Sequence, residues 1–222
     1  TDGACRHNQT AKLRRAGYGV WFGYAHNHPD SSPPYTIDAL NTPPDPRNIG
    51  LPLAGLVQTN NRAELSAAIH AAKLGALAIY TDSKYVIDGV NRMKRQASLY
   101  HLHNQDLWNQ MSQTLAARRE DIDFIKVKGH STIEMVDAGQ VRFEDKRGND
   151  AADSLAVEGA GQHDFPPELP QLFKDNKSLA VKILACMTDI LIENARINKE
   201  KTKEAAGADP PPPPDDGPPP PP

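Results

Sequence analysis

The spacing of apolar residues along the first 160 positions predicts a series of short strands and helices. Alternating or continuous apolar runs predict two strands within residues 1–24 and further strands at 51–58, 77–80 and 122–127. Spacings of three and four residues predict helices within residues 60–75, 84–90, 107–115 and 150–157. The run at 77–80 is apolar at every position, which is typical of a strand covered on both faces.

The order of these elements predicts an α/β fold. Strands joined by short turns pair as antiparallel hairpins, whereas strands separated by helices pair in parallel. We therefore expect a five-stranded mixed sheet, with an antiparallel hairpin half and a parallel βαβ half, flanked by helices. Residues 25–50 interrupt the series with six prolines, and we interpret them as a surface excursion between paired strands.

The remaining sequence changes character after the predicted domain, which we place at residues 1–160. A proline-containing linker is expected at 161–171 and an extended, disordered proline-rich tail at 207–222. Between them, residues 172–206 are predicted to form an amphipathic helix, because apolar residues recur with spacings of 7, 4, 3, 4 and 7: Leu172, Leu179, Ile183, Cys186, Ile190 and Ile197. Association with a partner and packing on its own domain both stay open for this helix.

Charge and cysteine content limit the function classes only weakly. Residues 1–160 carry 18 basic and 18 acidic residues, so the net charge of −3 lies in the remainder and bulk charge does not indicate nucleic acid. Two distant cysteines exclude a disulfide framework and favour a reducing compartment, nuclear or cytoplasmic. No apolar stretch approaches the ~20 residues of a membrane span, so no membrane partner is expected. The chain begins with Thr rather than Met, which suggests a segment of a longer protein.

Four acidic residues lie at or near the ends of predicted elements, where catalytic groups are often placed. They are Asp2, Glu64, Asp82 and Asp153. If the first and fourth strands are neighbours, Asp2 and Asp82 lie side by side at one edge of the sheet. Carboxylates without Cys or His suit Mg²⁺ or Mn²⁺ rather than Zn²⁺. For any single member of the set, a helix cap or a solvated surface charge is an equally good explanation.

Six motifs along the chain resemble those of the ribonuclease H family (type 1), as found in the reverse transcriptases of retroelements. In order they are Thr1-Asp2-Gly3-Ala4-Cys5, Gly17-Tyr18-Gly19, Thr59-Asn60-Asn61-Arg62-Ala63-Glu64-Leu65, Tyr80-Thr81-Asp82-Ser83-Lys84-Tyr85-Val86, Val127-Lys128-Gly129-His130 and Asn149 through Ala156. The resemblance covers residues 1 to about 160 and implies a ribonuclease H-like fold.

The resemblance also implies an activity and a set of site residues. The activity is hydrolysis of the RNA strand of RNA–DNA hybrids by two Mg²⁺ ions, with Mn²⁺ as a substitute, leaving 5′-phosphate and 3′-hydroxyl ends. The implied ligands are Asp2, Glu64, Asp82 and Asp153, and His130 is the implied proton shuttle. Asn8, Thr59, Asn60 and Asn61 match positions that contact the hybrid, although Thr59 and Asn60 also suit a helix cap. A polymerase domain in a parent polyprotein is the implied partner.

Several features depart from the family pattern. The segment at residues 91–105 is short and lacks Trp, residues 131–147 are inserted between His130 and Asp153, and Asp2 is the second residue of the chain. Asp150 is expected in the first turn of its helix rather than in the ligand set, and Asp88, Asp106, Asp123 and Asp137 are interpreted as solvated. Two alternative functions therefore remain: a hybrid-binding module with impaired catalysis, and another nuclease or transposase on the same fold.

Overall fold

The computed structural model describes residues 1–24 and 44–207, which divide after Phe165 into two compact units. Most of the predicted proline-rich excursion, residues 25–43, and all but the first residue of the predicted tail, residues 208–222, lie outside the described residues. No helix in the described part of the chain has the length and apolar character needed to cross a membrane.

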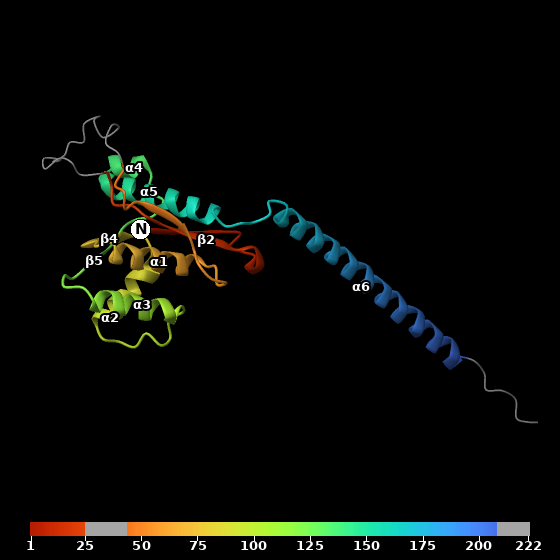
Figure 1. Ribbon diagram of the computed structural model, residues 1–222. Helices are drawn as coiled ribbons and strands as arrows, with labels where there is room; N and C mark the ends of the chain where they lie inside the picture. The colour runs from red at the N-terminus through yellow and green to blue at the C-terminus, as the bar shows by residue number, and fades with distance from the viewer. Residues whose placement is uncertain (25–43, 208–222) are drawn as a thin grey trace, which may run out of the picture. The chain divides into compact units, whose positions relative to one another are not determined.

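Within residues 1–24 and 44–165, the first unit contains five strands, and Figure 1 shows helices lying against them. β1 (Asp2–Arg6), β2 (Arg15–Val20) and β3 (Ile49–Pro52) form an antiparallel sheet in that order, with a short 3₁₀ helix, η1 (Ala11–Leu13), between the first two. β4 (Ala78–Thr81) and β5 (Asp123–Lys126) pair in parallel. The number of strands and the mixed pairing agree with the prediction, but the strands form two sheets rather than one. The sheets meet where the Thr1 amine donates to the Tyr80 carbonyl at 2.8 Å.

The third strand lies earlier in the sequence than predicted. It ends at Pro52, so only the start of the predicted span 51–58 is strand. Gly55 adopts a positive φ of 88°, which turns the chain out of extended conformation. The Gln58 side chain then stabilises the turn, since its amide donates to the Leu53 and Gly55 carbonyls at 2.9 and 2.7 Å and its oxygen accepts from the Ala16 amide at 2.8 Å.

Helices α1 (Asn60–Lys73) and α5 (Phe143–Gly161) both pack on the antiparallel sheet. The Gly17 and Gly19 positions of β2 allow α5 to approach, because a Cβ at either residue would lie 2.0–2.1 Å from the helix backbone. The α5 helix begins seven residues earlier than predicted, since part of the inserted segment 131–147 is helical: it forms α4 (Ile133–Asp137) and the first turn of α5.

The main hydrophobic core lies between α1, α2 (Lys84–Lys94), α3 (Gln105–Ala116) and β4. Trp108 is completely buried there, and its Nε1 donates to the Tyr85 hydroxyl at 2.8 Å. The prediction that β4 is covered on both faces is wrong, because Ala78 and Tyr80 are exposed while Ile79 and Thr81 are buried. Only the face of β4 directed at the helices contributes to the core. In the second unit, the described residues form the helix α6 (Leu169–Gly207).

Candidate active site

Asp2 is the first residue of β1 and lies at the end of the antiparallel sheet. It pairs with Gly19 of β2, so the two residues share the sheet face on which α5 packs. Asp2 is only 6% exposed, and its Oδ1 accepts a hydrogen bond of 2.7 Å from the Gly3 amide. A Cβ at Gly3 would lie 2.5 Å from the Glu64 amide nitrogen, so the missing side chain lets β1 lie against the start of α1.

Glu64 lies in the second turn of α1, where β1 packs against the helix at Gly3. The helix begins with Thr59 as its N-cap, whose hydroxyl accepts from the Arg62 amide at 3.3 Å. Glu64 is 5% exposed, and its Oε1 accepts from the Asn60 side-chain amide at 3.3 Å. Its Oε2 is buried and has no hydrogen-bond partner among the described residues. A buried, unsatisfied carboxylate oxygen is costly unless a cation or a proton compensates it.

Asp82 follows the last residue of β4, at the carboxyl end of the parallel pair. Ser83, the N-cap of α2, fixes the turn that carries it: the Ser83 amide donates to the buried Thr81 hydroxyl at 3.1 Å, and the Ser83 hydroxyl accepts from the Val86 amide at 3.4 Å. On the other side, a Cβ at Gly129 would lie 2.0 Å from Asp82 Oδ2. The loop after β5 therefore packs against the Asp82 carboxylate, and a side chain at position 129 would displace that carboxylate.

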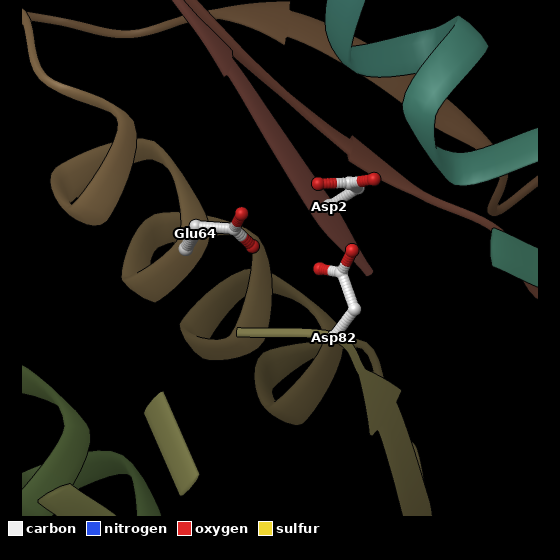
Figure 2. Close-up of side chains that lie close together, drawn as sticks. All are labelled: Asp2, Glu64 and Asp82. Atoms are coloured by element: carbon white, nitrogen blue, oxygen red, sulfur yellow. The ribbon is translucent and has the colours of Figure 1, made fainter. Parts of the chain in front are cut away.

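These three carboxylates converge from β1, α1 and the end of β4 (Figure 2). One oxygen from each of Asp2, Glu64 and Asp82 lies within 4.8 Å of the others. Burial, followed by the charge of Asp82, raises the pKa of Asp2 to about 6. Burial and then the charges of Asp2 and Asp82 raise the pKa of Glu64 well above its ordinary value. The site holds more negative charge than its surroundings compensate, which suits a divalent cation.

Asp153, the fourth predicted ligand, lies beside this cluster but outside the set of converging oxygens. Asp153 is half-buried on α5. The preceding residue, Ala152, directs its carbonyl at Gly19 of β2, and Gly19 pairs with Asp2 of β1. The charge of Asp153 contributes to the raised pKa of Asp2. The structure therefore brings three of the four predicted ligands together, and the role of Asp153 as a ligand stays a prediction.

The expectation that Asp150 lies in the first turn of its helix is wrong. Because α5 begins at Phe143, Asp150 lies in the helix interior, where it is exposed and forms an ion pair with Lys146. The start of the helix instead has Arg142 paired with Asp145 at 2.7 Å.

His130 is exposed on the loop after β5, next to Gly129 and so close to Asp82. Its backbone adopts a φ of 50°, in the left-handed region. The loop is anchored by the buried Ser131, whose hydroxyl donates to the Lys128 carbonyl at 2.7 Å. His130 is thus near the cluster and accessible, as a proton shuttle requires, and its role stays a prediction.

The predicted hybrid-contact residues occupy two places. Asn8 is exposed in the turn after β1, and its carbonyl accepts from Arg14 Nε at 2.6 Å. Thr59, Asn60 and Asn61 surround the first turn of α1: Thr59 is the cap, Asn60 contacts Glu64, and Asn61 is exposed. The substrate roles of all four residues stay predictions.

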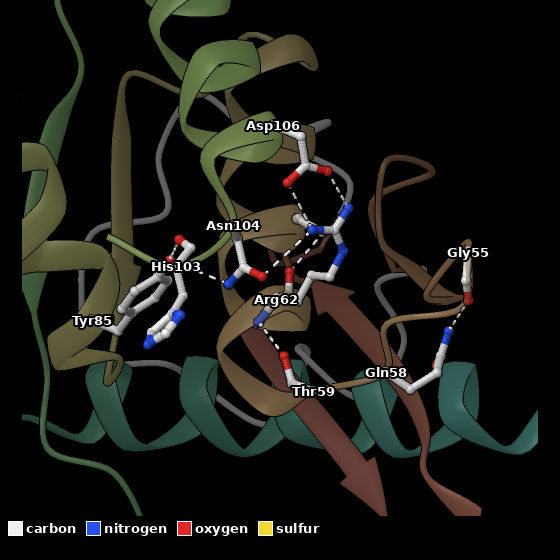
Figure 3. A network of polar contacts seen from close by, with 9 residues as sticks. Gly55, Gln58, Thr59, Arg62, Tyr85, His103, Asn104 and Asp106 are labelled. Atoms are coloured by element: carbon white, nitrogen blue, oxygen red, sulfur yellow. Dashed lines mark hydrogen bonds and ion pairs between the residues drawn. The ribbon is translucent and has the colours of Figure 1, made fainter. Parts of the chain in front are cut away.

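A polar network that the sequence did not indicate lies behind the first turn of α1 (Figure 3). Arg62 pairs with Asp106 and also donates to the Asn104 side chain at 3.4 Å. Asn104 in turn donates to the Tyr85 hydroxyl at 3.2 Å, and Tyr85 donates to the His103 carbonyl. Asp106 is exposed, as expected for a solvated acid, but it also pairs with Arg62, whose hydrogen bond lowers the pKa of Asp106.

This network joins the helix that carries Glu64 to the helix that follows Asp82. Arg62 lies two residues before Glu64, and Tyr85 lies three residues after Asp82. Asn104, the N-cap of α3 with a positive φ of 64°, forms hydrogen bonds with both Arg62 and Tyr85. The one signal of this network in the sequence is that Arg62 lies inside a motif of the family. Its partners Asn104 and Asp106 lie about 40 residues further along the chain, so local spacing does not reveal them.

Comparison with known proteins gives consistent matches. Residues 1–161 match the family model for RNase H. The chain is 39% identical over 129 residues to a protein named ribonuclease H from Schizosaccharomyces pombe, covering 53% of this chain and 43% of that protein. It is 30% identical over 177 residues to human ribonuclease H1, covering 73% and 49%. The chain thus spans less than half the length of either protein. The solution structure of the PFV RNase H domain matches with 23% identity and a TM-score of 0.47, covering 72% of this chain and 91% of that one.

Proposed function

Because the chain belongs to the RNase H family, we propose that residues 1–161 hydrolyse the RNA strand of RNA–DNA hybrids. The observation that supports this most directly is the convergence of Asp2, Glu64 and Asp82 within 4.8 Å. Two of the three carboxylates are almost completely buried. Burying like charges side by side costs folding free energy, and such clusters are typical of functional sites.

We further propose that the cluster holds divalent metal, with Mg²⁺ or Mn²⁺ as the ion. The donor set is all carboxylate, and the unsatisfied Glu64 Oε2 is available as a ligand. Metal ions at such a site, two in the proposed mechanism, would activate water and neutralise charge on the scissile phosphate, giving 5′-phosphate and 3′-hydroxyl ends. Asp153 is proposed as a further ligand.

The protein's own residues then have distinct parts in the proposal. The Asn60 side chain orients Glu64 through its 3.3 Å hydrogen bond, and the Gly3 amide orients Asp2. The Gly129 backbone restricts Asp82, while the adjacent, exposed His130 moves a proton at the reacting phosphate or helps product to leave. Asn8, Thr59, Asn60 and Asn61 contact the sugar and phosphate groups of the hybrid. The retroelement origin and an attached polymerase domain stay predictions.

A second candidate is a hybrid-binding module with impaired catalysis. It is favoured by one observation, namely that Asp153 does not join the converging oxygens. The two candidates predict the same substrate and differ only in turnover.

The test is cleavage of labelled RNA–DNA hybrid, with single-stranded RNA and duplex DNA as alternative substrates, each in Mg²⁺, Mn²⁺ or EDTA. The proposal expects metal-dependent cleavage of the hybrid alone, lost in Asp82→Asn and retained in Asp88→Asn, an exposed carboxylate on α2. Binding without cleavage in either metal would support the impaired module, and cleavage of duplex DNA would support another nuclease. Metal-dependent activity retained in Asp82→Asn would refute the proposed site.

A further inference from the structure

The helix of the second unit presents a long apolar stripe. α6 runs without interruption from Leu169 to Gly207 (Figure 1). The stripe consists of the residues with heptad-like spacing: Leu172, Leu179, Ile183, Cys186, Ile190 and Ile197. Its large side chains are substantially exposed, with Leu179, Ile183 and Ile190 each at 50–56%. Ile183, Ile190 and Ile197 take heptad position a, and Leu172, Leu179 and Cys186 take position d.

A row of alternating charges flanks this stripe on one side. Position g, directly before each a position, is occupied in turn by Asp175, Lys182, Asp189 and Arg196. In the isolated chain Arg196 bonds to Glu193 at 2.8 Å, and no ion pair is recorded for Lys182 or Asp189 in the described part of the molecule. Flanking charges of this kind set the orientation and register of paired helices.

We propose that α6 pairs with α6 of a second copy of this chain, in the antiparallel orientation. In that arrangement each a residue lies opposite a d residue, and g residues lie opposite g residues. Placing Ile183 opposite the second copy's position 186 also places Ile190 opposite position 179 and Ile197 opposite position 172, so that apolar residues meet apolar residues.

The same register matches every charge at position g. Asp175 meets position 196 and Lys182 meets position 189, so acid lies opposite base at four symmetric contacts. A shift of one heptad in either direction breaks this pattern, because it places Asp189 opposite itself or Lys182 opposite itself. The register is therefore specified by charge as well as by the apolar stripe.

A parallel pair is disfavoured by the same residues. In parallel helices position g lies opposite position e, where Asp175, Lys182 and Asp189 would meet positions 180, 187 and 194, which are Ala, Met and Asn. Parallel pairing also places Glu193 opposite itself within the seam. The antiparallel register instead places Glu193 opposite position 176, an Asn whose amide donates to a carboxylate.

The test uses the full chain and two charge reversals, Lys182→Glu and Asp189→Lys, in analytical ultracentrifugation. The wild-type chain is expected to self-associate, and each single variant is expected to do so with a dissociation constant about tenfold higher, since two attractive contacts become repulsive. The double variant should restore the wild-type constant. An equimolar mixture of the two single variants should form heterodimers, because each reversed charge then meets its opposite.

The outcomes distinguish a second copy of the chain from the other partners that could cover the apolar stripe. A wild-type chain that stays monomeric at all concentrations would overturn the proposal and favour packing on its own domain or on another protein. Self-association that is unaffected by the single reversals, or variants that do not recover on mixing, would also overturn it. Tetramers with the same charge response would support it, since Leu184 and Leu191 lie outside the seam and stay exposed in a pair. None of these outcomes depends on the activity of the first unit.

Discussion

The clearest physical consequence of the carboxylate cluster is that the metal-free protein is destabilised by its own charge. The pKa of Asp2 is raised from the ordinary value of 3.8 to about 6, first by burial and then by the charge of Asp82. Each unit of pKa difference is worth about 1.4 kcal/mol, so ionised Asp2 costs the folded state about 3 kcal/mol at pH 7.5. Asp2→Asn removes the charge, and its amide oxygen still accepts from the Gly3 amide.

The sign of the pH dependence follows from the direction of this shift. A carboxylate with a raised pKa in the folded state binds its proton more tightly there than in the unfolded chain, so the folded state gains stability as the pH falls. Above about pH 6 the full cost is present, and it disappears as the pH falls toward 3.8. The stability gain of Asp2→Asn is therefore expected to be about 3 kcal/mol at pH 7.5 and to shrink steadily below pH 6.

Urea unfolding in EDTA, followed by tryptophan fluorescence, measures this gain in the first unit. Both tryptophans, Trp21 and the buried Trp108, lie there, so α6 does not contribute to the signal. Asp88→Asn, at an exposed site on α2, is the matched control and is expected to change stability by less than about 0.5 kcal/mol. Added Mg²⁺ should stabilise the wild type more than Asp2→Asn. A gain that is absent at pH 7.5, or that stays constant from pH 7.5 to 4.5, would refute the electrostatic explanation.

Two further predictions concern the loop after β5. Gly129→Ala is expected to reduce hybrid cleavage by at least about tenfold, because its Cβ would lie 2.0 Å from Asp82 Oδ2. Gly148→Ala is the control, because its Cβ meets nothing nearer than 4.0 Å. It should leave hybrid cleavage unchanged and stabilise α5 by about 0.5–1 kcal/mol. Equal activity of both variants in the cleavage assay would contradict the expected displacement of Asp82. His130→Ala is expected to slow turnover without abolishing it and to alter the pH–rate profile, since the exposed His130 beside the cluster is the proposed proton carrier. An unchanged profile would count against its proton role.

The sequence by itself determined those features that depend on nearby residues. The start of α1 after Thr59, its end before Gly75 and the position of Asp82 directly after a strand follow from local spacing and capping, and the structure confirms each of them. The order of the elements predicted Asp2 beside Asp82 on the condition that the first and fourth strands are neighbours. The structure brings the two carboxylates together, although it assigns the two strands to separate sheets.

The tertiary structure decided whatever depends on partners that are distant in the chain. It pairs the exposed Asp106 with Arg62 across 44 residues, a partner that the sequence did not indicate. It also leaves Tyr80 exposed in a strand whose composition suggested complete burial, because only one face of β4 is packed against the helices. Residue spacing reports the periodicity of an element, whereas burial and ion pairing depend on which other elements lie against it, and that is set only when the chain packs.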